Sequence, residues 1–432
     1  MPYLDYGYTV TIKTPATSDP TATTVTNQWQ RQLPKNTKWE DVGSGETYEI
    51  APGDRSAKIR LQQNLDGAKA YSNELQVTSA DFDMDNGLGD FGNFSGSTKW
   101  YGGVLAPNGM IYGIPYSSTT VLEIDPNDQT TTTFGSLSGN GKWNGGVLAP
   151  NGKIYGIPYG STTVLEIDPT TPGFPTTRTS GSLSPSGYKW QGGVLAPNGK
   201  IYGIPHSFSS VLEIDPTTPD TQGFPTISTF DSLSGNYKWS GGVLAPNGKI
   251  YGIPSYSTTV LEIDPNDQTT TTFGTLSGEY KWSGGVLAPN GKIYGIPHDS
   301  SSVLEIDPGS RTATTFAILG SQAGRGKWSG GVLSPNGKIY GIPYKSTSVL
   351  EIDPVNRSAK TFGSLSKNAS KWNGGVLAPN GKIYGIPYVY TTVLEMDFGS
   401  PAATGGAGSE NWALPGLPGD ILDPRSAYFN KY

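Results

Sequence analysis

The sequence contains no cysteine, which excludes disulfide cross-links and thiolate-bound metals. Charged residues are scarce, at 15% of the chain where about 25% is usual for soluble domains, and the net charge is −6. Because no basic stripe offsets this acidic balance, we do not expect nucleic-acid binding. No apolar run approaches the roughly 18 residues that a membrane-spanning helix needs, so no membrane insertion is expected. The opening residues, MPYLDYGYTVTIKT, lack the basic and apolar regions of a secretory signal.

Glycine and proline are abundant instead, with 59 and 34 residues, beside many threonines, serines and aromatics. This composition suits short strands joined by tight turns. Stretches rich in Ala, Glu, Lys and Leu, the residues that favour helices, do not occur. The sequence therefore predicts an all-β protein.

A fourteen-residue stretch, GGVLAPNGKIYGIP, occurs five times unchanged and twice more with one substitution. A Lys-Trp pair opens each repeat, and successive tryptophans are 43 to 49 residues apart, as for Trp100 and Trp143 or Trp190 and Trp239. Periods of about 40 to 50 residues with strand signals indicate a propeller or a solenoid. In the second repeat we expect strands over 143–149, 153–157 and 163–168, and a fourth ending near 182–184. Four strands make one propeller blade.

The ends of the repeat array predict how it closes. The last repeat stops after its third strand at Asp397, whereas Asp90–Ser97, ahead of the first repeat, aligns with Thr133–Ser138 before Trp143. We therefore expect the N-terminal segment to supply the outer strand of the seventh blade, a strand exchange that leaves no exposed edge at the seam. A solenoid is the alternative, but neither terminal repeat resembles a cap.

Residues that recur in every repeat are expected to serve the blade itself. The Gly-Gly pair beginning at Gly102 would lie on the strand nearest the axis, where a Cβ would clash, and each tryptophan would pack between neighbouring blades. The repeated lysines could ring one channel mouth and bind an anion, or each could pair with an acid of Glu-Ile-Asp in an adjacent blade, which we favour. The repeated aspartates fit turn chemistry better than calcium binding. The lysines are Lys99, Lys142, Lys189, Lys238, Lys281, Lys327 and Lys371, and the aspartates are Asp125, Asp168, Asp215, Asp264, Asp307, Asp353 and Asp397.

The loop between the second and third strands of each repeat, the b–c loop, keeps its length and changes its side chains. Rigid scaffolds diversify a binding surface in this way. The loop that joins one repeat to the next, the d–a loop, also varies and would lie on the same face of the ring. Aromatic rings among hydroxyls and amides suit stacking on sugars or a polar protein contact, and a surface drifting without selection is the further alternative. The candidate ligand-binding residues are Tyr116, Tyr159, His206, Phe208, Tyr256, His298, Tyr344, Tyr388 and Tyr390.

No constellation of catalytic or metal-ligating residues is evident. The two histidines, His206 and His298, occupy the same repeat position two blades apart, too distant on a sevenfold ring to share a metal or a proton transfer. There are no distinctive paired carboxylates, no Ser-His-Asp order and no phosphate-cradling glycine loop. Near-identical blades also argue against the asymmetric centre that an active site needs. We therefore predict a non-enzymatic protein with no catalytic residues, no metal and no cofactor.

Residues 1–79 differ from the repeats and are expected to form a separate β domain. Six alternating runs, the first at 8–12 and the last at 74–77, are its strand candidates. The Trp29-Gln30 pair and Tyr71-Ser72-Asn73 resemble cysteine-free Ig-like β-sandwich domains of bacterial and phage surface proteins. We expect residues 80–89 to be a linker, 90–398 the propeller, and 399–432, rich in Gly and Pro and then aromatic, a C-terminal arm.

The repeated Ala-Pro-Asn-Gly-Lys-Ile-Tyr and Val-Leu-Glu-Ile-Asp-Pro motifs resemble those of YVTN- and NHL/SMP-30-type seven-bladed propellers, a resemblance that implies a fold rather than an activity. With the Ig-like module, the chain resembles bacteriophage virion proteins such as fibres, appendages or capsid decorations. We therefore expect a virion structural and adhesion protein. Its partners would be other virion proteins or further copies of itself in a homo-oligomer, with cell-surface polysaccharide as the candidate ligand. A soluble, multivalent lectin-like propeller of cellular origin is the alternative, and a propeller hydrolase is a third.

Overall fold

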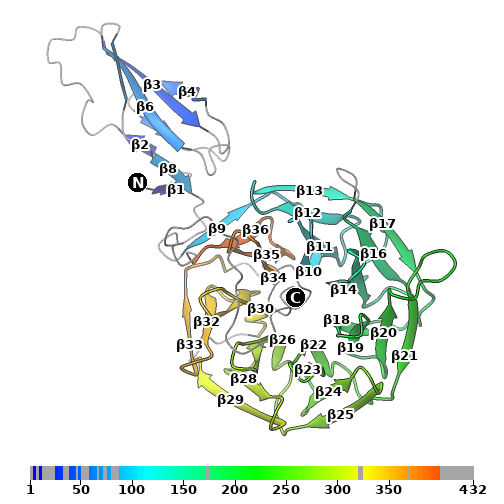
Figure 1. Cartoon of the computed structure of the whole chain (residues 1–432). Coiled ribbons are helices and arrows are strands. Elements are labelled where there is room, and N and C mark those ends of the chain that lie inside the picture. The colour runs from blue at the N-terminus through cyan, green and yellow to red at the C-terminus, as the bar shows by residue number, and fades with distance from the viewer. Residues whose placement is uncertain are drawn as a thin grey trace, which may run out of the picture. The chain divides into compact units, whose positions relative to one another are not determined.

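The computed structural model describes residues 87–170, 175–319, 325–367 and 370–398, the strands between Tyr3 and Thr78, and residues 38–39. The chain divides into two compact units, Met1–Asp90 and Phe91–Tyr432. Every described element is a β-strand, which confirms the all-β prediction (Figure 1). No helix of the described residues is long and apolar enough to span a bilayer. The C-terminal arm predicted over 399–432 lies outside the described residues, as does most of the predicted linker.

The first unit contains a six-stranded sheet of order β1-β8-β6-β3-β4, with β7 paired to β6, and a two-stranded sheet of β2 and β5. Its strands are β1 (Tyr3–Asp5), β2 (Thr9–Thr11), β3 (Val25–Gln32), β4 (Glu40–Ser44), β5 (Thr47–Glu49), β6 (Lys58–Leu65), β7 (Ala68–Tyr71) and β8 (Leu75–Thr78). Each of the six expected runs contains a strand, while β1 and β7 were not expected. Trp29 and Leu61 are buried and opposite each other on β3 and β6. The Ig-like assignment stays a prediction.

The repeats form seven four-stranded antiparallel sheets, one for each Lys-Trp pair. The first three sheets comprise β10 (Trp100–Leu105), β11 (Ile111–Pro115), β12 (Val121–Asp125) and β13 (Thr130–Phe134); β14 (Trp143–Leu148), β15 (Ile154–Pro158), β16 (Val164–Asp168) and β17 (Thr176–Ser180); and β18 (Trp190–Leu195), β19 (Ile201–Pro205), β20 (Val211–Asp215) and β21 (Thr226–Phe230). The next three comprise β22 (Trp239–Leu244), β23 (Ile250–Pro254), β24 (Val260–Asp264) and β25 (Thr269–Phe273); β26 (Trp282–Leu287), β27 (Ile293–Pro297), β28 (Ser302–Asp307) and β29 (Thr312–Ile318); and β30 (Trp328–Leu333), β31 (Ile339–Pro343), β32 (Val349–Asp353) and β33 (Ser358–Phe362).

The seventh sheet joins the two ends of the repeat array. It contains β34 (Trp372–Leu377), β35 (Ile383–Pro387) and β36 (Val393–Met396), and its fourth strand is β9 (Leu88–Phe91), which precedes the first repeat. The Phe91 side chain is buried, with its ring 5.9 Å from that of Tyr384. The first strand of each sheet lies nearest the centre in Figure 1 and contacts its neighbours' first strands, and the series returns from β34 to β10.

The outer strand of each repeat ends earlier than the sequence suggested. β17 stops at Ser180 rather than near 182–184, because Gly181 has a φ of 95° and turns the chain out of the extended conformation. The same left-handed glycine follows β13 and β9, where Gly135 and Gly92 have φ values of 88° and 83°. The residues after this turn therefore belong to the d–a loop rather than to the strand.

The Gly-Gly pairs lie at the crowded centre, as predicted. A Cβ on Gly103 would come within 2.6 Å of Ile386 Cδ1, and one on Gly284, whose φ is +76°, would come within 3.0 Å of Gly330 Cα. The tryptophans pack between sheets, also as predicted, and Trp143 is buried together with Val104 and Ile114 of the preceding sheet. In all seven repeats the indole N–H donates to a backbone carbonyl twenty residues later, at 2.7 or 2.8 Å.

The expected pairing of the repeated lysines with acids is wrong. Lys281 is 3% exposed, and its Nζ donates to the carbonyls of Ser255, Ser257 and Gly278 at 2.8–2.9 Å. The ammonium of Lys281 therefore joins a b–c loop to the following d–a loop, and those of Lys99, Lys142 and Lys238 do the same. Burial lowers the pKa of Lys281 to about 8, so it remains mostly protonated at neutral pH. These buried lysines do not form an exposed ring for an anion.

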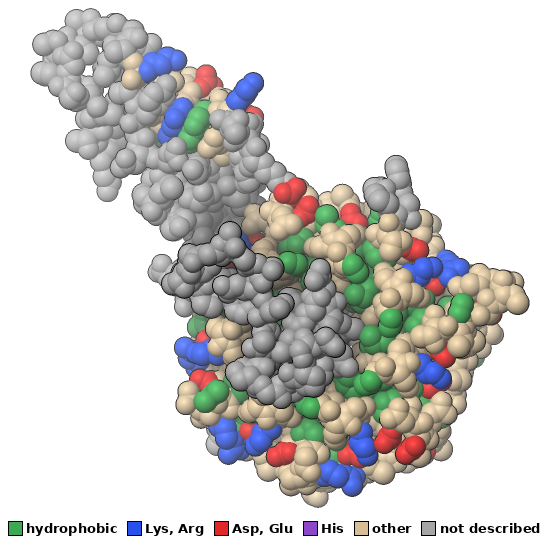
Figure 2. Space-filling model, viewed as in Figure 1, with side chains coloured by type: hydrophobic (Ala, Val, Ile, Leu, Met, Phe, Trp, Pro, Cys, Tyr) green, Lys and Arg blue, Asp and Glu red, His purple; other side chains and the backbone are tan. Residues whose placement is uncertain are grey.

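The repeated acids have other partners. Glu166 is bound by Lys153 Nζ at 2.8 Å and by Arg178 Nε at 2.6 Å within its own sheet. Asp125 Oδ1 accepts the backbone N–H of Asn127 at 2.9 Å, which supports the turn role. Figure 2 shows lysine and arginine interspersed with aspartate and glutamate around the outer part of the ring, without a large patch of one sign.

Candidate binding site at the channel mouth

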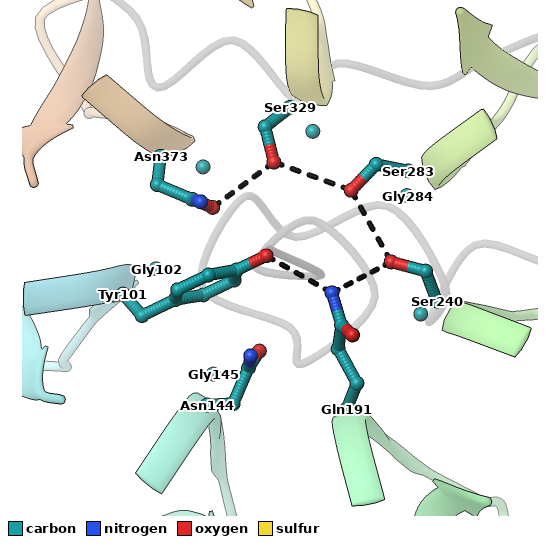
Figure 3. A pocket seen from close by; sticks show the side chains of 13 residues that line it. Tyr101, Gly102, Asn144, Gly145, Gln191, Ser240, Ser283, Gly284, Ser329 and Asn373 are labelled. Carbon is teal, nitrogen blue, oxygen red and sulfur yellow. Dashed lines mark hydrogen bonds between the residues drawn. The ribbon is translucent and has the colours of Figure 1, made fainter. Parts of the chain in front are cut away.

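The residue between the repeated tryptophan and Gly-Gly points to the central axis. Because the glycines that follow bring neighbouring strands together, the side chains at this position meet across the narrow centre (Figure 3). All seven are uncharged and polar, and we call them the axial collar. The axial collar consists of Tyr101, Asn144, Gln191, Ser240, Ser283, Ser329 and Asn373.

Hydrogen bonds run through most of this collar. Gln191 Nε2 donates to Tyr101 Oη at 2.9 Å and to Ser240 Oγ at 2.7 Å. The series of hydrogen bonds continues from Ser240 Oγ to Ser283 Oγ and from Ser283 Oγ to Ser329 Oγ, with an oxygen–oxygen distance of 3.2 Å in each. Ser329 Oγ then donates to Asn373 Oδ1 at 3.1 Å. Tyr101 is the one aromatic member, and its ring extends across the centre in Figure 3. The collar therefore differs from one side of the axis to the other.

The residue before each Lys-Trp pair has a positive φ. Glycine occupies this position in the second and sixth repeats, as conformational preference favours. In the third, fourth and fifth repeats it is tyrosine, with φ values of 61° at Tyr188, 54° at Tyr237 and 48° at Tyr280. A bulky residue there carries backbone strain, and such strain concentrates at functional sites. Thr98 and Ser370 also have positive φ values at this position, of 50° and 60°, but only the three consecutive tyrosines place a large ring there.

In six of the seven repeats the first residue of the b–c loop carries a ring, and these rings form a belt around the same mouth. Ring centroids lie 5.8 Å apart for Tyr344–Tyr388, Tyr388–Tyr116, Tyr116–Tyr159 and Tyr159–His206, and 5.9 Å apart for His298–Tyr344. The fourth repeat breaks the series with Ser255, which is buried.

A cavity of about 330 Å³ lies at this interruption. Aromatic rings and uncharged polar groups surround it, and no Asp, Glu, Lys or Arg is among the described residues that line it. The strained tyrosines of the third to fifth repeats form part of its wall, and four of the seven axial-collar residues also line it. The lining residues are Tyr101, Tyr159, Tyr188, Gln191, His206, Tyr237, Ser240, Ser255, Tyr280, Trp282, Ser283 and His298.

The opposite side of the mouth is filled by packed rings. Tyr101, Tyr116 and Tyr388 contact one another pairwise with centroids 5.7–5.8 Å apart. Burial raises the pKa of Tyr116 to about 12, and burial together with neighbouring phenols also raises the pKa of Tyr388. These phenols therefore stay neutral over the physiological range. We call this the closed side, and the cavity bounded by Tyr237 and Ser255 the open side.

The two histidines differ although they occupy equivalent positions in the cavity wall. His206 Nδ1 lies 3.0 Å from the carbonyl oxygen of Trp239, so it donates, and Nε2 is left as an acceptor. Burial lowers the pKa of His206 to about 4, which keeps the imidazole neutral above pH 5. His298 Nδ1 instead lies 2.9 Å from Asp299 Oδ1. No group of three or more His, Cys, Asp or Glu in the described part of the chain could hold a metal.

The predicted binding residues separate into four groups. Tyr159, His206 and His298 line the cavity, whereas Tyr116, Tyr344 and Tyr388 belong to the belt beside it. Tyr256 contacts the wall from outside, with its ring 4.3 Å from that of Tyr280. Phe208 and Tyr390 pack on the blade tryptophans Trp190 and Trp372, with ring centroids 4.8 Å apart. These two rings lie against the sheets and do not line the cavity.

Sequence reasoning missed the three strained tyrosines and the axial collar. The sequence does contain a signal for them. The residue before each Lys-Trp pair and the residue between each tryptophan and Gly-Gly vary within an otherwise nearly invariant stretch. The expectation of a uniform centre was also wrong. Tyr101 on one side and Ser255 on the other make the mouth asymmetric, although the sheets around it are nearly identical.

No protein-family model matches the chain, and no curated protein sequence matches it. Solved structures are similar. A streptogramin B lyase is 12% identical with a TM-score of 0.59, over 72% of this chain and 97% of that one. A catalytically inactive virginiamycin B lyase from Staphylococcus aureus, with quinupristin, is 11% identical with a TM-score of 0.59, over 71% and 98%. The extracellular domain of a hybrid two-component system from B. thetaiotaomicron is 9% identical with a TM-score of 0.54, over 85% and 52%. These likenesses show a β-propeller-like fold and no activity.

Proposed function

We propose that the chain is a non-enzymatic adhesion protein whose closed seven-bladed propeller binds neutral saccharides in the cavity on the open side of the mouth. The observation that carries this proposal is the lining, in which aromatic rings and uncharged hydrogen-bonding groups surround one cavity of about 330 Å³. Small-molecule sites are concave, largely aromatic or apolar, and contain a few directed polar groups. The volume lies near the lower end of the usual range of about 300–1,000 Å³, which suits one or two sugar residues.

The chemistry of the lining favours a sugar over other ligands. Tyrosine and tryptophan offer flat apolar faces together with a polar edge, which matches a sugar ring and its hydroxyls. An ionic ligand would lose its hydration without gaining a charged partner, because the described lining contains none. His206 stays neutral above pH 5 and leaves Nε2 as an acceptor. The cavity therefore suits a neutral, hydroxyl-rich molecule.

Catalysis has one candidate group in the cavity wall. His298 with Asp299 is an acid–base pair, and the fold neighbours include lyases. However, Asp299 also accepts the backbone N–H of Gly326 at 2.6 Å, so the carboxylate holds the d–a loop as well as the imidazole. No carboxylate is among the described lining residues, whereas glycosidic cleavage by paired carboxylates requires two. We therefore expect a bound saccharide to be recovered intact after prolonged incubation, and new reducing ends would contradict this.

The virion setting is supported by the sequence resemblance alone, namely the cysteine-free Ig-like module joined to highly duplicated blades. Mass spectrometry of purified particles of a phage that encodes the chain tests it directly. Peptides at a stoichiometry comparable to that of other structural proteins would support the proposal. Absence from the particles, together with intact saccharide binding, would favour the cellular lectin-like alternative.

Binding is tested with the full-length chain on bacterial cells and on polysaccharide extracted from their surface. Saturable binding is expected for the wild type. Ser255→Tyr introduces the residue found at the equivalent position of four other repeats, so it fills the cavity without a foreign side chain. We expect this variant to fold and to lose binding at least tenfold. Val355→Tyr, at a residue that is 86% exposed, controls for an added tyrosine. Equal binding by wild type and Ser255→Tyr would contradict a site in this cavity.

A further inference from the structure

The cavity narrows sharply at its inner end. Below it, the axial collar and the glycines behind it leave a space of only about 20 Å³, roughly enough for one water molecule. A Cβ on Gly102 would already lie 3.3 Å from Gly145 Cα, so the backbones leave no further room. Tyr101 and Gln191 line both the cavity and this constriction. A saccharide chain therefore cannot pass through the axis and must stop at the collar.

Among the described residues, the hydrogen bonds at the floor of the cavity leave two polar atoms without a partner. Gln191 has two amide hydrogens, and both are taken by Tyr101 Oη and Ser240 Oγ. Its Oε1 consequently remains as an acceptor. Tyr101 Oη accepts from Gln191, so its own proton remains to be donated. Figure 3 shows the Gln191 nitrogen meeting the Tyr101 hydroxyl at the centre, with the Gln191 oxygen on the other branch of the same amide, so the donor and the acceptor belong to two side chains in contact at the bottom of the cavity.

We infer that the cavity is an end-binding site, which takes the terminal residue of a neutral saccharide and holds two neighbouring hydroxyls with the Tyr101 phenol and the Gln191 amide oxygen. A vicinal diol is the group that matches an adjacent donor and acceptor, because one hydroxyl can accept while the next donates. The floor admits only the end of a chain, since the constriction blocks passage. This inference names the ligand class of the proposed saccharide site and rests on that proposal.

The aromatic walls support an end-on arrangement. Tyr188 is 49% exposed, and its ring lies 5.0 Å from that of Tyr159 and 6.4 Å from that of Tyr237. The wall of rings therefore continues from the buried interior to the solvent. A terminal sugar at the floor would leave the next residue of the saccharide against the outer rings, while the rest of the chain remains in solution.

Partial hydrolysis tests recognition of chain ends. Surface polysaccharide that binds the full-length protein is divided into two portions. One portion is cut into fragments about a tenth as long, so that it has ten times as many saccharide ends at equal mass. Used as competitors, the fragments should be about ten times more potent per unit mass. Equal or lower potency after hydrolysis would show binding along the chain interior and would overturn the inference, while leaving saccharide binding in place. Failure of every polysaccharide to bind would overturn both.

The role of Tyr101 and Gln191 at the floor of the cavity is tested with Tyr101→Phe, which keeps the ring and removes only the phenol proton and oxygen. Tyr116→Phe is the matched control, because Tyr116 contacts Tyr101 but does not line the cavity. Binding of methyl hexopyranosides and their monodeoxy analogues is measured by calorimetry. We expect Tyr101→Phe to weaken binding of the best methyl hexoside about tenfold and to have little effect on the deoxy analogue that lacks its partner hydroxyl. Equal effects of the two tyrosine variants on every sugar would overturn the assignment.

Discussion

The two sides of the channel mouth are built on the same framework and differ in whether they contain a cavity. On the closed side, Tyr101 and Tyr116 fill the space between the first sheets and the axis. On the open side, the equivalent positions carry Ser240 and Ser255 in the fourth sheet, and the space remains accessible. The strands, the glycine pairs and the buried lysines are the same on both sides. Single residues at two or three positions per repeat therefore decide where this scaffold has a cavity.

The two sides also differ in the residue that occupies the positive-φ position before Lys-Trp. On the closed side, Gly141 and Thr98 occupy the positive-φ position before Lys-Trp, and on the open side three tyrosines do. Tyrosine costs more than glycine in this conformation, by an amount of order 1 kcal/mol or more for each residue. Thr98 in the first repeat and Ser370 in the seventh have the same backbone conformation away from the cavity, so strain alone does not mark the open side. What distinguishes the open side is that a large ring occupies this position in each of the three consecutive repeats.

The largest expected effect comes from breaking the framework that both sides share. Gly284→Ala places a Cβ 3.0 Å from the backbone of Gly330 at a φ of +76°, so steric overlap adds to conformational strain. We expect a loss of about 3–5 kcal/mol in the free energy of unfolding, measured by urea denaturation. Gly291→Ala is the control, because it has the same φ of +76° and no atom within 4 Å. That variant should lose only about 1 kcal/mol, and equal losses would show that crowding at the axis is unimportant.

The buried lysine of the open side should come next. Lys281→Met keeps the length and packing of the side chain but leaves the carbonyls of Ser255, Ser257 and Gly278 without their donor. We expect a loss of about 2–3 kcal/mol in unfolding free energy and weaker saccharide binding, since the loop that carries Ser255 is no longer held. Lys345→Met, at an exposed lysine of another b–c loop, should leave the unfolding free energy and the saccharide binding nearly unchanged. A Lys281→Met variant as stable as wild type would contradict the role of the ammonium.

Strain and binding can be separated at Tyr237, in the wall of the cavity. Tyr237→Gly installs the residue that Gly141 and Gly326 already provide at this position, which suits its φ of 54°. We expect binding to fall at least tenfold, while the unfolding free energy changes by less than about 1 kcal/mol because relief of strain offsets the lost contacts. Ser370→Gly changes the equivalent residue away from the cavity and should not alter binding. If both glycine variants bind alike, the strained tyrosines have another purpose.

Much of the fold follows from the sequence, because repetition reveals it without any knowledge of side-chain contacts. The Asn-Gly turns, the period of the tryptophans and the alignment of Asp90–Ser97 with Thr133–Ser138 indicate four-stranded units and the origin of the last strand. The lysine partners could not be predicted in this way. Three carbonyls converge on Lys281 only after the loops have folded, and a nearby acid in the sequence was the more obvious partner.

The candidate site was only partly predictable for the same reason. Variation in the b–c loops identified Tyr159, His206 and His298, which line the cavity. It also suggested Phe208 and Tyr390, because sequence position does not show which way a loop side chain turns. The cavity itself depends on an absence, the serine at position 255 where most repeats have an aromatic ring. A missing ring becomes a cavity only when its neighbours surround it in space.

The smallest expected effect concerns the two histidines, which occupy one repeat position on the open side. Burial lowers the pKa of His206 from about 6.5 to about 4 in the folded chain, so between these values the unfolded state binds more protons. The contribution of a neutral His206 to stability is therefore complete above pH 6.5 and is lost as the pH falls through 4. Carboxylates titrate over the same range, so the measurement is the difference in melting temperature between pH 7 and pH 4.5 for each variant.

His206→Gln should reduce that difference by a few degrees, because glutamine keeps an N–H for the Trp239 carbonyl and takes up no proton. His298→Gln is the matched control, because it makes the same substitution at the equivalent repeat position, where the imidazole contacts the Asp299 carboxylate rather than a carbonyl. If His298→Gln reduces the pH dependence as much as His206→Gln does, the two environments are equivalent in solution. The contrast between them, and with it the asymmetry of the open side, would then have to be abandoned.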